Sequence, residues 1–383
     1  AGDARCVYFP STGRAEGGGR SDDHLWSIFS VCTYIKETGD YAFLDETVPY
    51  TDKGEATVFE HLKAGMEFTR RTVGEHGVPL FLHCDWNDSI KNISARKKKA
   101  ETSFVFFQAG HAAYELIKLF EHTGDKEKLD WARDYYDWCK SIYPVLWDGK
   151  WFLRGFTDDG EKFGTDEDEY NKIFLNPQSW AVLSRLPSKE QGDSAFENVE
   201  SRLFCDLGVC SHAPASTGIN YEKKWYFGAK AGVRENGGVF FHASTWAIIA
   251  ETLLKRNEEA YSLYHRELPT VRNDRADQCM VEPYVYSSSM IGPAHERYGA
   301  GVGSWLSGTA SWMYLAASQY ILGFRPDYDG VIIDPCVPFE WDGFSYTRIY
   351  RGIKCEVSSP KLPKVGAEAK ALVVDGEEIS TRY

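Results

Sequence analysis

Apolar residues recur at intervals of three and four over most of the chain up to residue 322, which is the spacing of amphipathic helices. In SDDHLWSIFSVCTYIKETGD, Ser21 has the position of an N-cap and Gly39 that of a helix stop. The same spacing predicts further helices over residues 55–75, 101–122, 126–142, 179–186, 244–263 and 303–322. The chain is therefore predicted to be mainly α up to this point.

A short internal repeat supports a repeated helical unit. KETGDYAFLDE and EHTGDKEKLDW share the pattern T-G-D-x-x-x-L-D, each at the end of a long helical segment. Gly39 and Gly124 stand where a helix needs a left-handed C-cap, and Asp40 and Asp125 can begin the next helix. Helical hairpins of this length predict an (α/α)6 toroid, with loops at one end carrying function. A plain helical solenoid is the alternative.

The pattern changes after Pro326. GVIIDPCVPFEWDGFSYTRIYRGIKCEVSS alternates β-branched and aromatic residues with turn residues, and KALVVDGEEI adds another strand with an Asp-Gly turn. We therefore predict three parts: an irregular lead-in over 1–20, the toroid over 21–322, and a small antiparallel, jelly-roll-like β domain over 323–383.

Composition excludes several classes of function. The formal net charge is −13, with no basic cluster beyond Lys97 to Lys99, so no nucleic-acid partner is expected. Apolar runs are too short to span a bilayer, so no membrane partner is expected either. The nine cysteines are scattered, which indicates reduced thiols and a cytoplasmic location. Cys205, Cys210 and His212 lack a fourth ligand, and we predict no metal.

HCDWNDSI (83–90) is the first candidate for chemistry. It follows a Pro-containing extended run, so Asp85 and Asp88 are expected at a loop mouth. Cleaving a glycosidic bond requires a protonated carboxyl beside the leaving oxygen, and an aromatic wall such as Trp86 raises the pKa of a carboxyl group. In the alternative, Asp85 or Asp88 only caps the turn through its own backbone.

Several segments together resemble one family, the inverting glycoside phosphorylases of glycoside hydrolase family 94. DWND (85–88), VRENGGVFFH (233–242) and WLSGTASWMY (305–314) are similar to its motifs, and the resemblance extends in order along nearly the whole chain. It implies that Asp88 is the general acid, that Trp86 contacts sugar, and that Arg234 and Glu235 contact the acceptor sugar.

The same resemblance implies a phosphate site and a donor site. His242, Ser307, Gly308 and Thr309 match the phosphate-binding positions, and hydroxyl, imidazole and backbone N–H donors suit an anion independently of the family. Asp22, in GRSDDHLW, matches the aspartate that holds the donor sugar. The alternatives are a structural core histidine for His242 and a first-turn acid facing the helix dipole for Asp22.

The chain departs from the family pattern at several points. Ser288, which is expected to bind substrate, stands where the family has a glutamine, and Arg234 stands where it has a lysine. The two family arginines before the donor aspartate have only approximate counterparts in Arg5, Arg14 and Arg20, of which Arg14 is taken as the substrate-binding one. Family members also have an N-terminal β-sandwich that this sequence lacks. We therefore expect either a homodimer or an association with that missing domain.

The function predicted is reversible, inverting phosphorolysis of a β-linked disaccharide or short oligosaccharide, which makes the chain an enzyme of the glycosyltransferase class. Its substrates are a small carbohydrate and inorganic phosphate, and no cofactor is implied. Phosphate is already a nucleophile, whereas an inverting hydrolase needs a second carboxylate roughly 6.5–9.5 Å from the acid. The alternatives are such a hydrolase on the same toroid and an inactive carbohydrate-binding fragment.

Overall fold

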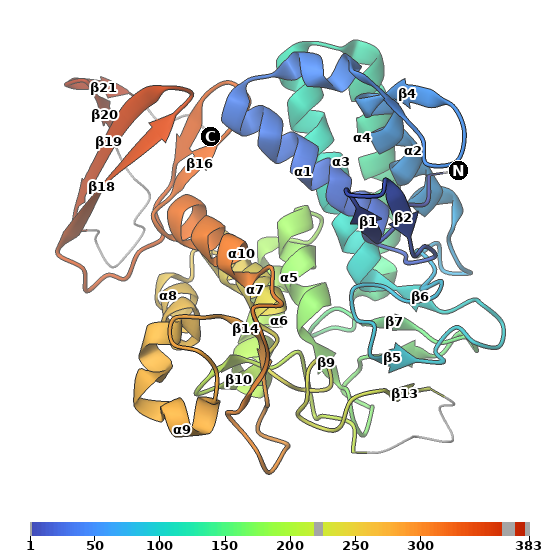
Figure 1. Ribbon diagram of the computed structural model, residues 1–383. Helices are drawn as coiled ribbons and strands as arrows, with labels where there is room; N and C mark the ends of the chain where they lie inside the picture. Colours follow the sequence, from blue (N-terminus) through green and yellow to red (C-terminus); the bar gives the residue numbers. More distant parts are fainter. Residues whose placement is uncertain (1, 218–224, 362–371, 380–383) are drawn as a thin grey trace.

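Helices dominate the structure, a computed structural model that describes residues 2–217, 225–361 and 372–379 (Figure 1). The α-helices are α1 (Asp23–Thr38), α2 (Val58–Arg71), α3 (Ser103–Thr123), α4 (Lys126–Ile142), α5 (Leu175–Ser184), α6 (Lys189–Leu203), α7 (Phe241–Leu253), α8 (Asn257–Glu267), α9 (Ala276–Cys279) and α10 (Thr309–Leu315). Shorter turns are the 3₁₀ segments Tyr41–Asp45, Tyr143–Leu146 and Pro269–Arg275 and the π-helical segment Ala316–Ile321. The predicted mainly helical class is confirmed.

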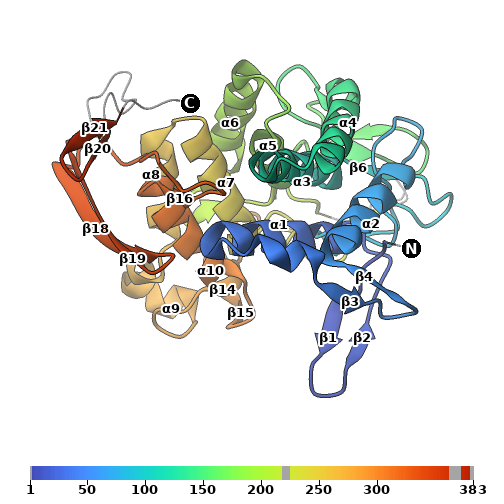
Figure 2. The same ribbon diagram turned by 90° about the horizontal axis from the view of Figure 1, so that it is seen from above.

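The helices pack as successive hairpins. α1 contacts α3, α3 contacts α5, and α5 contacts α7, while each of these four helices also packs against the helix that follows it in the chain. Figure 2 shows α3, α5 and α7 on the inside, with α4, α6 and α8 outside them. α5 is buried along its whole length, because α3, α7 and the outer helix α6 surround it. The core is aromatic: the rings of Trp180 and Trp246 lie 5.4 Å apart, edge to face.

The internal repeat marks two helix ends correctly. Gly39 and Gly124 both adopt the left-handed conformation, and their N–H groups donate to Ile35 O and Phe120 O. Asp125 then caps α4 by accepting from Lys128 N.

The predicted N-cap at Ser21 is wrong. An N-cap at Ser21 would start the helix at Asp22, but the N-cap is Asp22 and α1 starts at Asp23. The Ser21 hydroxyl donates instead to Cys84 O. This bond ties the start of α1 to the loop that carries Asp85.

The predicted helices over 244–263 and 303–322 are wrong in extent, and one helix was missed. Residues 244–263 are not one helix, because the chain turns at Lys255 (φ 63°) between α7 and α8. The segment 303–322 begins as a strand, and α10 starts only at Thr309. α6 was not predicted, although Ser188 and Gln191 form a capping box at its start.

The strands are short and pair in antiparallel fashion. They are β1 (Val7–Phe9), β2 (Arg14–Glu16), β3 (Thr47–Pro49), β4 (Glu55–Thr57), β5 (Ile90–Lys91), β6 (Glu101–Thr102), β7 (Gly155–Phe156), β8 (Lys162–Phe163), β9 (Ile173–Phe174), β10 (Phe204–Cys205), β11 (Gly208–Val209), β12 (His212–Ala213), β13 (Tyr226–Phe227), β14 (Ser287–Met290), β15 (Gly301–Ser304), β16 (Phe324–Pro326), β17 (Val331–Ile333), β18 (Gly343–Tyr350), β19 (Ile353–Pro360), β20 (Leu372–Val374) and β21 (Glu377–Ile379).

The lead-in and the C-terminal segment contain strands of different extent. Residues 1–20 are not wholly irregular, because β1 and β2 form a hairpin with Val7 opposite Glu16; residue 1 lies outside the described part. Beyond residue 323, β16–β17, β18–β19 and β20–β21 each form an antiparallel pair. The predicted β segment is present there, although 362–371 and 380–383 lie outside the described residues.

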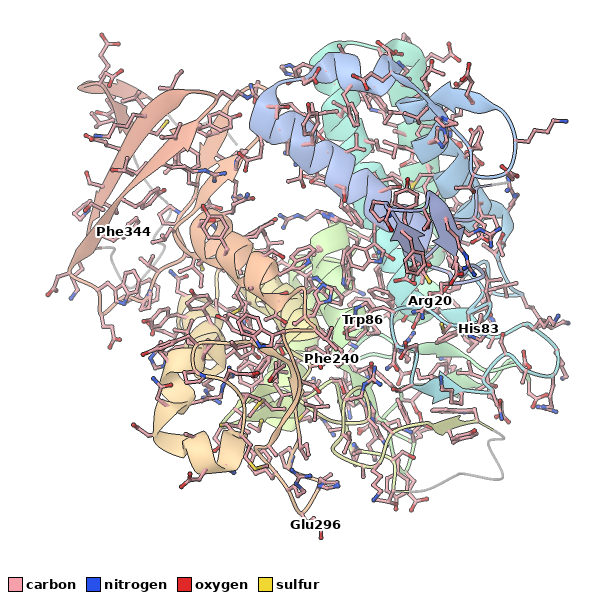
Figure 3. All side chains as sticks on the ribbon, in the orientation of Figure 1. Arg20, His83, Trp86, Phe240, Glu296 and Phe344 are labelled. Atoms are coloured by element: carbon pink, nitrogen blue, oxygen red, sulfur yellow. The ribbon has the colours of Figure 1, made fainter. Side chains whose placement is uncertain are left out.

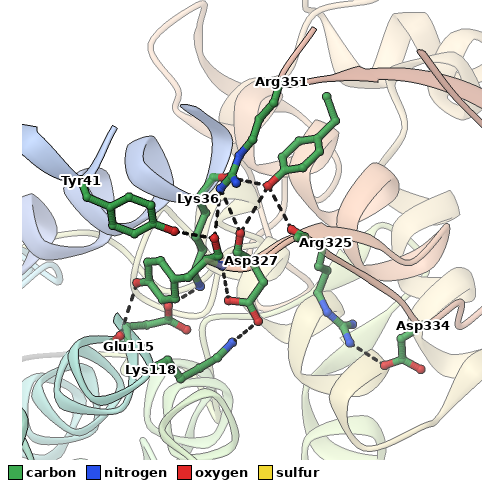
Figure 4. A network of polar contacts seen from close by, with 11 residues as sticks. Lys36, Tyr41, Glu115, Lys118, Arg325, Asp327, Asp334 and Arg351 are labelled. Atoms are coloured by element: carbon green, nitrogen blue, oxygen red, sulfur yellow. Dashed lines mark hydrogen bonds and ion pairs between the residues drawn. The ribbon is translucent and has the colours of Figure 1, made fainter. Parts of the chain in front are cut away.

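A polar network joins these C-terminal strands to α1 and α3 (Figure 4). Lys118 Nζ of α3 lies 2.6 Å from an Asp327 carboxylate oxygen, and Tyr41 donates its hydroxyl proton to Tyr328 O. Tyr350 Oη at the end of β18 lies 2.9 Å from Lys36 O of α1. The strands therefore dock on the helices through polar contacts as well as apolar ones.

Within these described ranges, no helix combines the length and the apolar character needed to cross a membrane.

Candidate active site

A cavity of about 300 Å³ opens at one end of the helices, where segments distant in sequence meet. Its walls come from the start of α1, the loop 86–88, the segment 234–242 and the turn before α10. The lining residues are Arg20, Asp22, Asp23, Trp26, Trp86, Asp88, Arg234, Glu235, Phe240, His242, Leu306, Ser307 and Gly308. Residues from all the motif segments singled out in the sequence, DDHLW, DWND, RENGG-to-His and the SGT turn, thus face one space.

Asp85 and Asp88 have different environments. Asp85 is fully buried, and its carboxylate binds the Arg154 guanidinium at 2.6 and 2.8 Å, the Thr102 hydroxyl at 2.7 Å and Asn87 N at 2.9 Å. Asp85 is therefore the residue that caps the turn through the backbone, and it anchors the loop on which Asp88 stands.

Asp88 faces the cavity, with 39% of its side chain exposed. Arg20 Nη2 lies 3.6 Å from one of its carboxylate oxygens, and Arg234 Nη2 lies 3.9 Å from the other. Trp86 forms the adjacent wall, with its ring 4.7 Å from that of Phe240 (Figure 3). The carboxyl group proposed as the acid is therefore reachable from the cavity and held between two guanidinium groups.

The segment 233–238 folds as a tight turn that presents Arg234 and Glu235. Arg234 is left-handed (φ 52°), and a Cβ on Gly238 would lie 2.5 Å from Arg234 O, so a glycine is required there. Glu235 is 2% exposed and accepts a hydrogen bond from the Ser89 hydroxyl, next to Asp88. The turn thereby joins the RENGG segment to the DWND loop.

His242 lies deeper in the cavity, at the start of α7. Its ring packs 4.8 Å from Trp246, and no hydrogen-bond partner for Nε2 exists among the described residues. Burial lowers the pKa of His242 to about 4, so the imidazole is neutral at pH 7. A Cβ on Gly308 would lie 3.7 Å from this ring. A neutral imidazole with a free nitrogen suits a ligand that can exchange a hydrogen bond with it.

Ser307 and Thr309 are connected to each other. Their hydroxyl groups share a hydrogen bond, and Thr309 N donates to Ser307 Oγ at 3.0 Å. Ser307 lines the cavity, whereas Thr309 is fully buried behind it. Thr309 can therefore orient the Ser307 hydroxyl, but a ligand in the cavity reaches Ser307 first.

Asp22 stands on the opposite wall, at the N-cap of α1. Burial, together with the charge of Asp85, raises the pKa of Asp22 to about 7. One carboxylate oxygen accepts from Trp26 Nε1 at 2.9 Å, and the other has no protein partner among the described residues. Asp22 thus presents an unused hydrogen-bonding oxygen to the cavity.

Two predicted site residues lie elsewhere. Arg14 is on β2, 72% exposed, where it pairs with Glu16, and Ser288 Oγ donates to Val302 O within the β14–β15 pair. Neither lines the cavity. Arg20, which the sequence offered only as an approximate counterpart, is the arginine beside Asp88.

Trp26, Asp23, Phe240 and Leu306 also line the cavity and were not predicted. The signal for Trp26 was available, because it follows Asp22 by four residues and so lies on the same face of the helix. Among the residues described, no group of three or more His, Cys, Asp or Glu side chains has the arrangement of a metal site.

Comparison with known proteins shows to which family the chain belongs. The model for the catalytic domain of the glycosyl hydrolase 94 superfamily matches residues 6–323. The N,N'-diacetylchitobiose phosphorylase of Vibrio proteolyticus is 35% identical over 368 residues, which are 94% of this chain and 45% of that protein. The solabiose phosphorylase of Paenibacillus borealis is 35% identical over 364 residues, 94% of this chain and 47% of that protein. The chain thus spans about half the length of these curated relatives.

Among solved structures, a sialidase aligns with a TM-score of 0.64 and 14% sequence identity, covering 91% of this chain and 31% of the sialidase. At that identity the likeness bears on the fold alone.

Proposed function

The chain belongs to the glycosyl hydrolase 94 superfamily, and from this premise we propose that it carries the catalytic site of a glycoside phosphorylase. The reaction is reversible, inverting phosphorolysis of a β-linked disaccharide or short β-oligosaccharide. One observation carries the proposal: Asp88, His242 and Ser307, from three distant segments, line the same cavity. The phosphorylases of Vibrio proteolyticus and Paenibacillus borealis support the same class of activity.

In the proposed mechanism, Asp88 gives its proton to the glycosidic oxygen as the bond from that oxygen to the anomeric carbon breaks. A phosphate oxygen forms the new bond to the anomeric carbon from the opposite face, so a β-linked substrate gives an α-sugar 1-phosphate and a shortened sugar. Neutral His242 and the Ser307 hydroxyl bind phosphate, with Gly308 beside the ring and Thr309 behind Ser307. Asp22 and Trp86 hold the donor sugar, and Arg234 and Glu235 contact the acceptor.

A hydrolase is the second candidate, because further carboxylates line the cavity. Asp22, Asp23 and Glu235 all border it, and an inverting hydrolase requires one of them as a base that activates water. The presence of a neutral imidazole with an unused nitrogen favours phosphate over this alternative.

We extend the proposal to the architecture and the setting of the enzyme. The hairpin packing of α1 to α8 supports an (α/α)6 toroid over residues 21–322, followed by a jelly-roll-like domain over 323–383. The exposed residues Trp305 (71%) and Leu306 (79%), of which Leu306 lines the cavity, support either a homodimer or an association with an N-terminal β-sandwich. The nine free cysteines support a cytoplasmic location.

The test is the release of sugar 1-phosphate from β-linked disaccharides with and without inorganic phosphate. The panel is cellobiose, chitobiose, laminaribiose, sophorose and cellobionate. Release that depends on phosphate supports the phosphorylase and identifies the substrate. Release of free sugar regardless of phosphate supports the hydrolase, and binding of a disaccharide without turnover supports a carbohydrate-binding role.

A further inference from the structure

Two cysteines meet on the β10–β11 hairpin, outside the candidate active site. Cys205 ends β10 and pairs with Gly208, so the strand register places Cys210, just beyond β11, diagonally opposite Cys205 on the same face of the hairpin. Cys210 N donates to Leu203 O at 2.9 Å, which continues this register. The two thiols form a hydrogen bond with each other, and neither is part of a disulfide. Their sulfur atoms are therefore adjacent without a covalent bond.

The two thiols differ in reactivity. The hydrogen bond from Cys210 lowers the pKa of Cys205, against the opposing effect of burial. The same hydrogen bond, together with burial, raises the pKa of Cys210. Cys205 is partly exposed, whereas Cys210 is buried. In a redox pair, the accessible thiol that ionises more readily is the nucleophile, and the neighbouring thiol closes the disulfide.

Cys210 is connected directly to the turn that forms one wall of the active-site cavity, the segment 234–242. It forms an antiparallel bridge with Val239 of this segment. The next residue, Ser211, donates its hydroxyl proton to Glu235 O at 2.9 Å, and its N–H donates to another carbonyl oxygen of the same turn at 2.8 Å. A movement of Cys210 is therefore passed to the turn through the backbone and through Ser211.

A disulfide on this hairpin requires such a movement. Diagonal neighbours across an antiparallel pair have Cα atoms about 7–8 Å apart, whereas a disulfide usually requires about 4.4–6.8 Å. Formation of the bond therefore draws Cys210 towards Cys205, and Ser211 follows with its hydrogen bonds. Because Arg234 and Glu235 stand on the turn that Ser211 holds, the oxidised hairpin displaces both of them.

We propose that Cys205 and Cys210 are a redox pair that a peroxide oxidises to a disulfide, and that this bond lowers activity by displacing the turn 234–242. Formation of the bond does not depend on the proposed phosphorylase function, whereas its effect on catalysis rests on that function. The pair lies outside the cavity and is not part of the catalytic machinery.

The oxidation proceeds in two steps. The Cys205 thiolate attacks one oxygen of hydrogen peroxide and the O–O bond breaks; the departing hydroxide takes up the proton that the thiol released, which leaves a sulfenic acid and one water. The Cys210 sulfur then attacks the sulfenic sulfur, the S–O bond breaks, and hydroxide leaves with the Cys210 proton as a second water. The two thiols lose two electrons and two protons, and the peroxide is reduced to water. A dithiol such as dithiothreitol reverses the bond by thiol–disulfide exchange.

The experiment compares reduced and peroxide-treated protein for the wild type, Cys205→Ser and Cys210→Ser. The control is Cys355→Ser, which removes another partly exposed thiol. Peptide mass spectrometry identifies the disulfide, and dimedone labelling identifies a sulfenic acid. We expect the disulfide in the wild type and in Cys355→Ser, and dimedone on Cys205 in Cys210→Ser.

Two further readouts report the turn. Hydrogen exchange over residues 234–242 should become faster in the oxidised wild type and return to its original rate after dithiothreitol. Oxidation should lower kcat/KM for phosphorolysis by about tenfold in the wild type and in Cys355→Ser, because small displacements of substrate-positioning groups are costly. Cys205→Ser should keep its kcat/KM when treated with peroxide.

The contrary outcomes are distinct. If peroxide forms no disulfide between Cys205 and Cys210 in the wild type, the proposal is overturned. A disulfide that leaves exchange over 234–242 unchanged overturns it as well, and so does an equal loss of activity in Cys205→Ser. No turnover by the reduced protein contradicts the phosphorylase instead. The disulfide and exchange measurements then still decide the redox pair, because neither of them requires activity.

Discussion

The ion pair between Asp85 and Arg154 is buried and supports the loop that carries Asp88. The guanidinium is 1% exposed and the carboxylate 0% exposed. Removing one partner leaves the other charge buried without compensation, which costs about 3–5 kcal/mol. We expect Arg154→Leu to lower the free energy of unfolding by about that amount in urea titrations. Arg133→Leu is the control, because Arg133 forms an exposed pair with Glu121 and should cost less than about 1 kcal/mol. Equal losses in the two variants would contradict this role for Arg154.

Asp22 makes stability depend on pH. Burial, with the charge of Asp85, raises the pKa of Asp22 from 3.8 to about 7. Between these two values the folded state holds a proton that the unfolded state has lost, so the free energy of unfolding falls as the pH rises. Asp22→Asn removes this titration while keeping an acceptor for Trp26.

We therefore compare the free energy of unfolding of Asp22→Asn with that of the wild type. The difference should shift in favour of the variant by about 2–3 kcal/mol between pH 5 and pH 8, because of the difference between the two pKa values. Urea unfolding of both proteins at the two pH values measures it. If the difference in free energy of unfolding between the two proteins is the same at pH 5 and pH 8, Asp22 is already ionised in the folded protein at both pH values.

For individual residues, the sequence located the segments that line the cavity better than it located the side chains that face it. The role of Asp85 could not be separated from that of Asp88, because Arg154, which neutralises Asp85, lies 69 residues away. Ser288 was expected at the site by its place in a motif, but its hydroxyl group bonds within a strand pair. Both outcomes depend on tertiary contacts that local spacing does not encode.

The capping box of α6 gives a prediction for a single element. Ser188 Oγ accepts from Gln191 N, and the Gln191 side chain accepts from Ser188 N at 3.1 Å. Ser188→Ala should lower the free energy of unfolding by about 1 kcal/mol, because it leaves a helix N–H group without a partner. α6 is an outer helix, so kcat/KM should not change. Ser201→Ala, at the other end of the same helix, should have little effect on stability. A loss in Ser201→Ala as large as that in Ser188→Ala would exclude the capping explanation.

Helices were predictable in proportion to the regularity of their apolar spacing. α4 has the predicted bounds, Lys126–Ile142, because both its cap and its apolar face are local features. α6 was missed because its few apolar residues leave a weak pattern. The prediction of one long helix over 244–263 was wrong because the backbone is left-handed at Lys255, and no glycine marks that position in the sequence.

The docking of the C-terminal strands on the helices gives a prediction for the whole molecule. Tyr350 Oη lies within 2.9 to 3.3 Å of three carbonyl oxygens, those of Lys36, Gly330 and Asp327. Tyr350→Phe should lower stability by about 1 kcal/mol and speed amide exchange in β18 and β19, while α3 and α5 remain protected. Hydrogen exchange with mass spectrometry measures both regions. The control is Tyr34→Phe, which removes an exposed bond to Asp40. Uniform protection in Tyr350→Phe would contradict this docking role.

The sequence predicted the change from helix to strand near residue 323 but not how the two parts meet. Tyr41 and Tyr328, which bond at this junction, lie 287 residues apart, and Lys118 and Asp327 lie 209 apart. Side-chain periodicity reports burial within an element, and it carries no information about which distant element covers it.

The central claim is that Asp88 drives an inverting transfer to phosphate, and proton NMR of the first turnovers tests it most directly. The wild-type chain and Asp88→Asn are each followed with inorganic phosphate and the disaccharide found to be the substrate. We predict that the wild type forms the α-anomer of the sugar 1-phosphate and that Asp88→Asn, folded by circular dichroism, loses at least about a thousandfold in rate. A β-anomer, or a rate in Asp88→Asn close to that of the wild type, would contradict the claim.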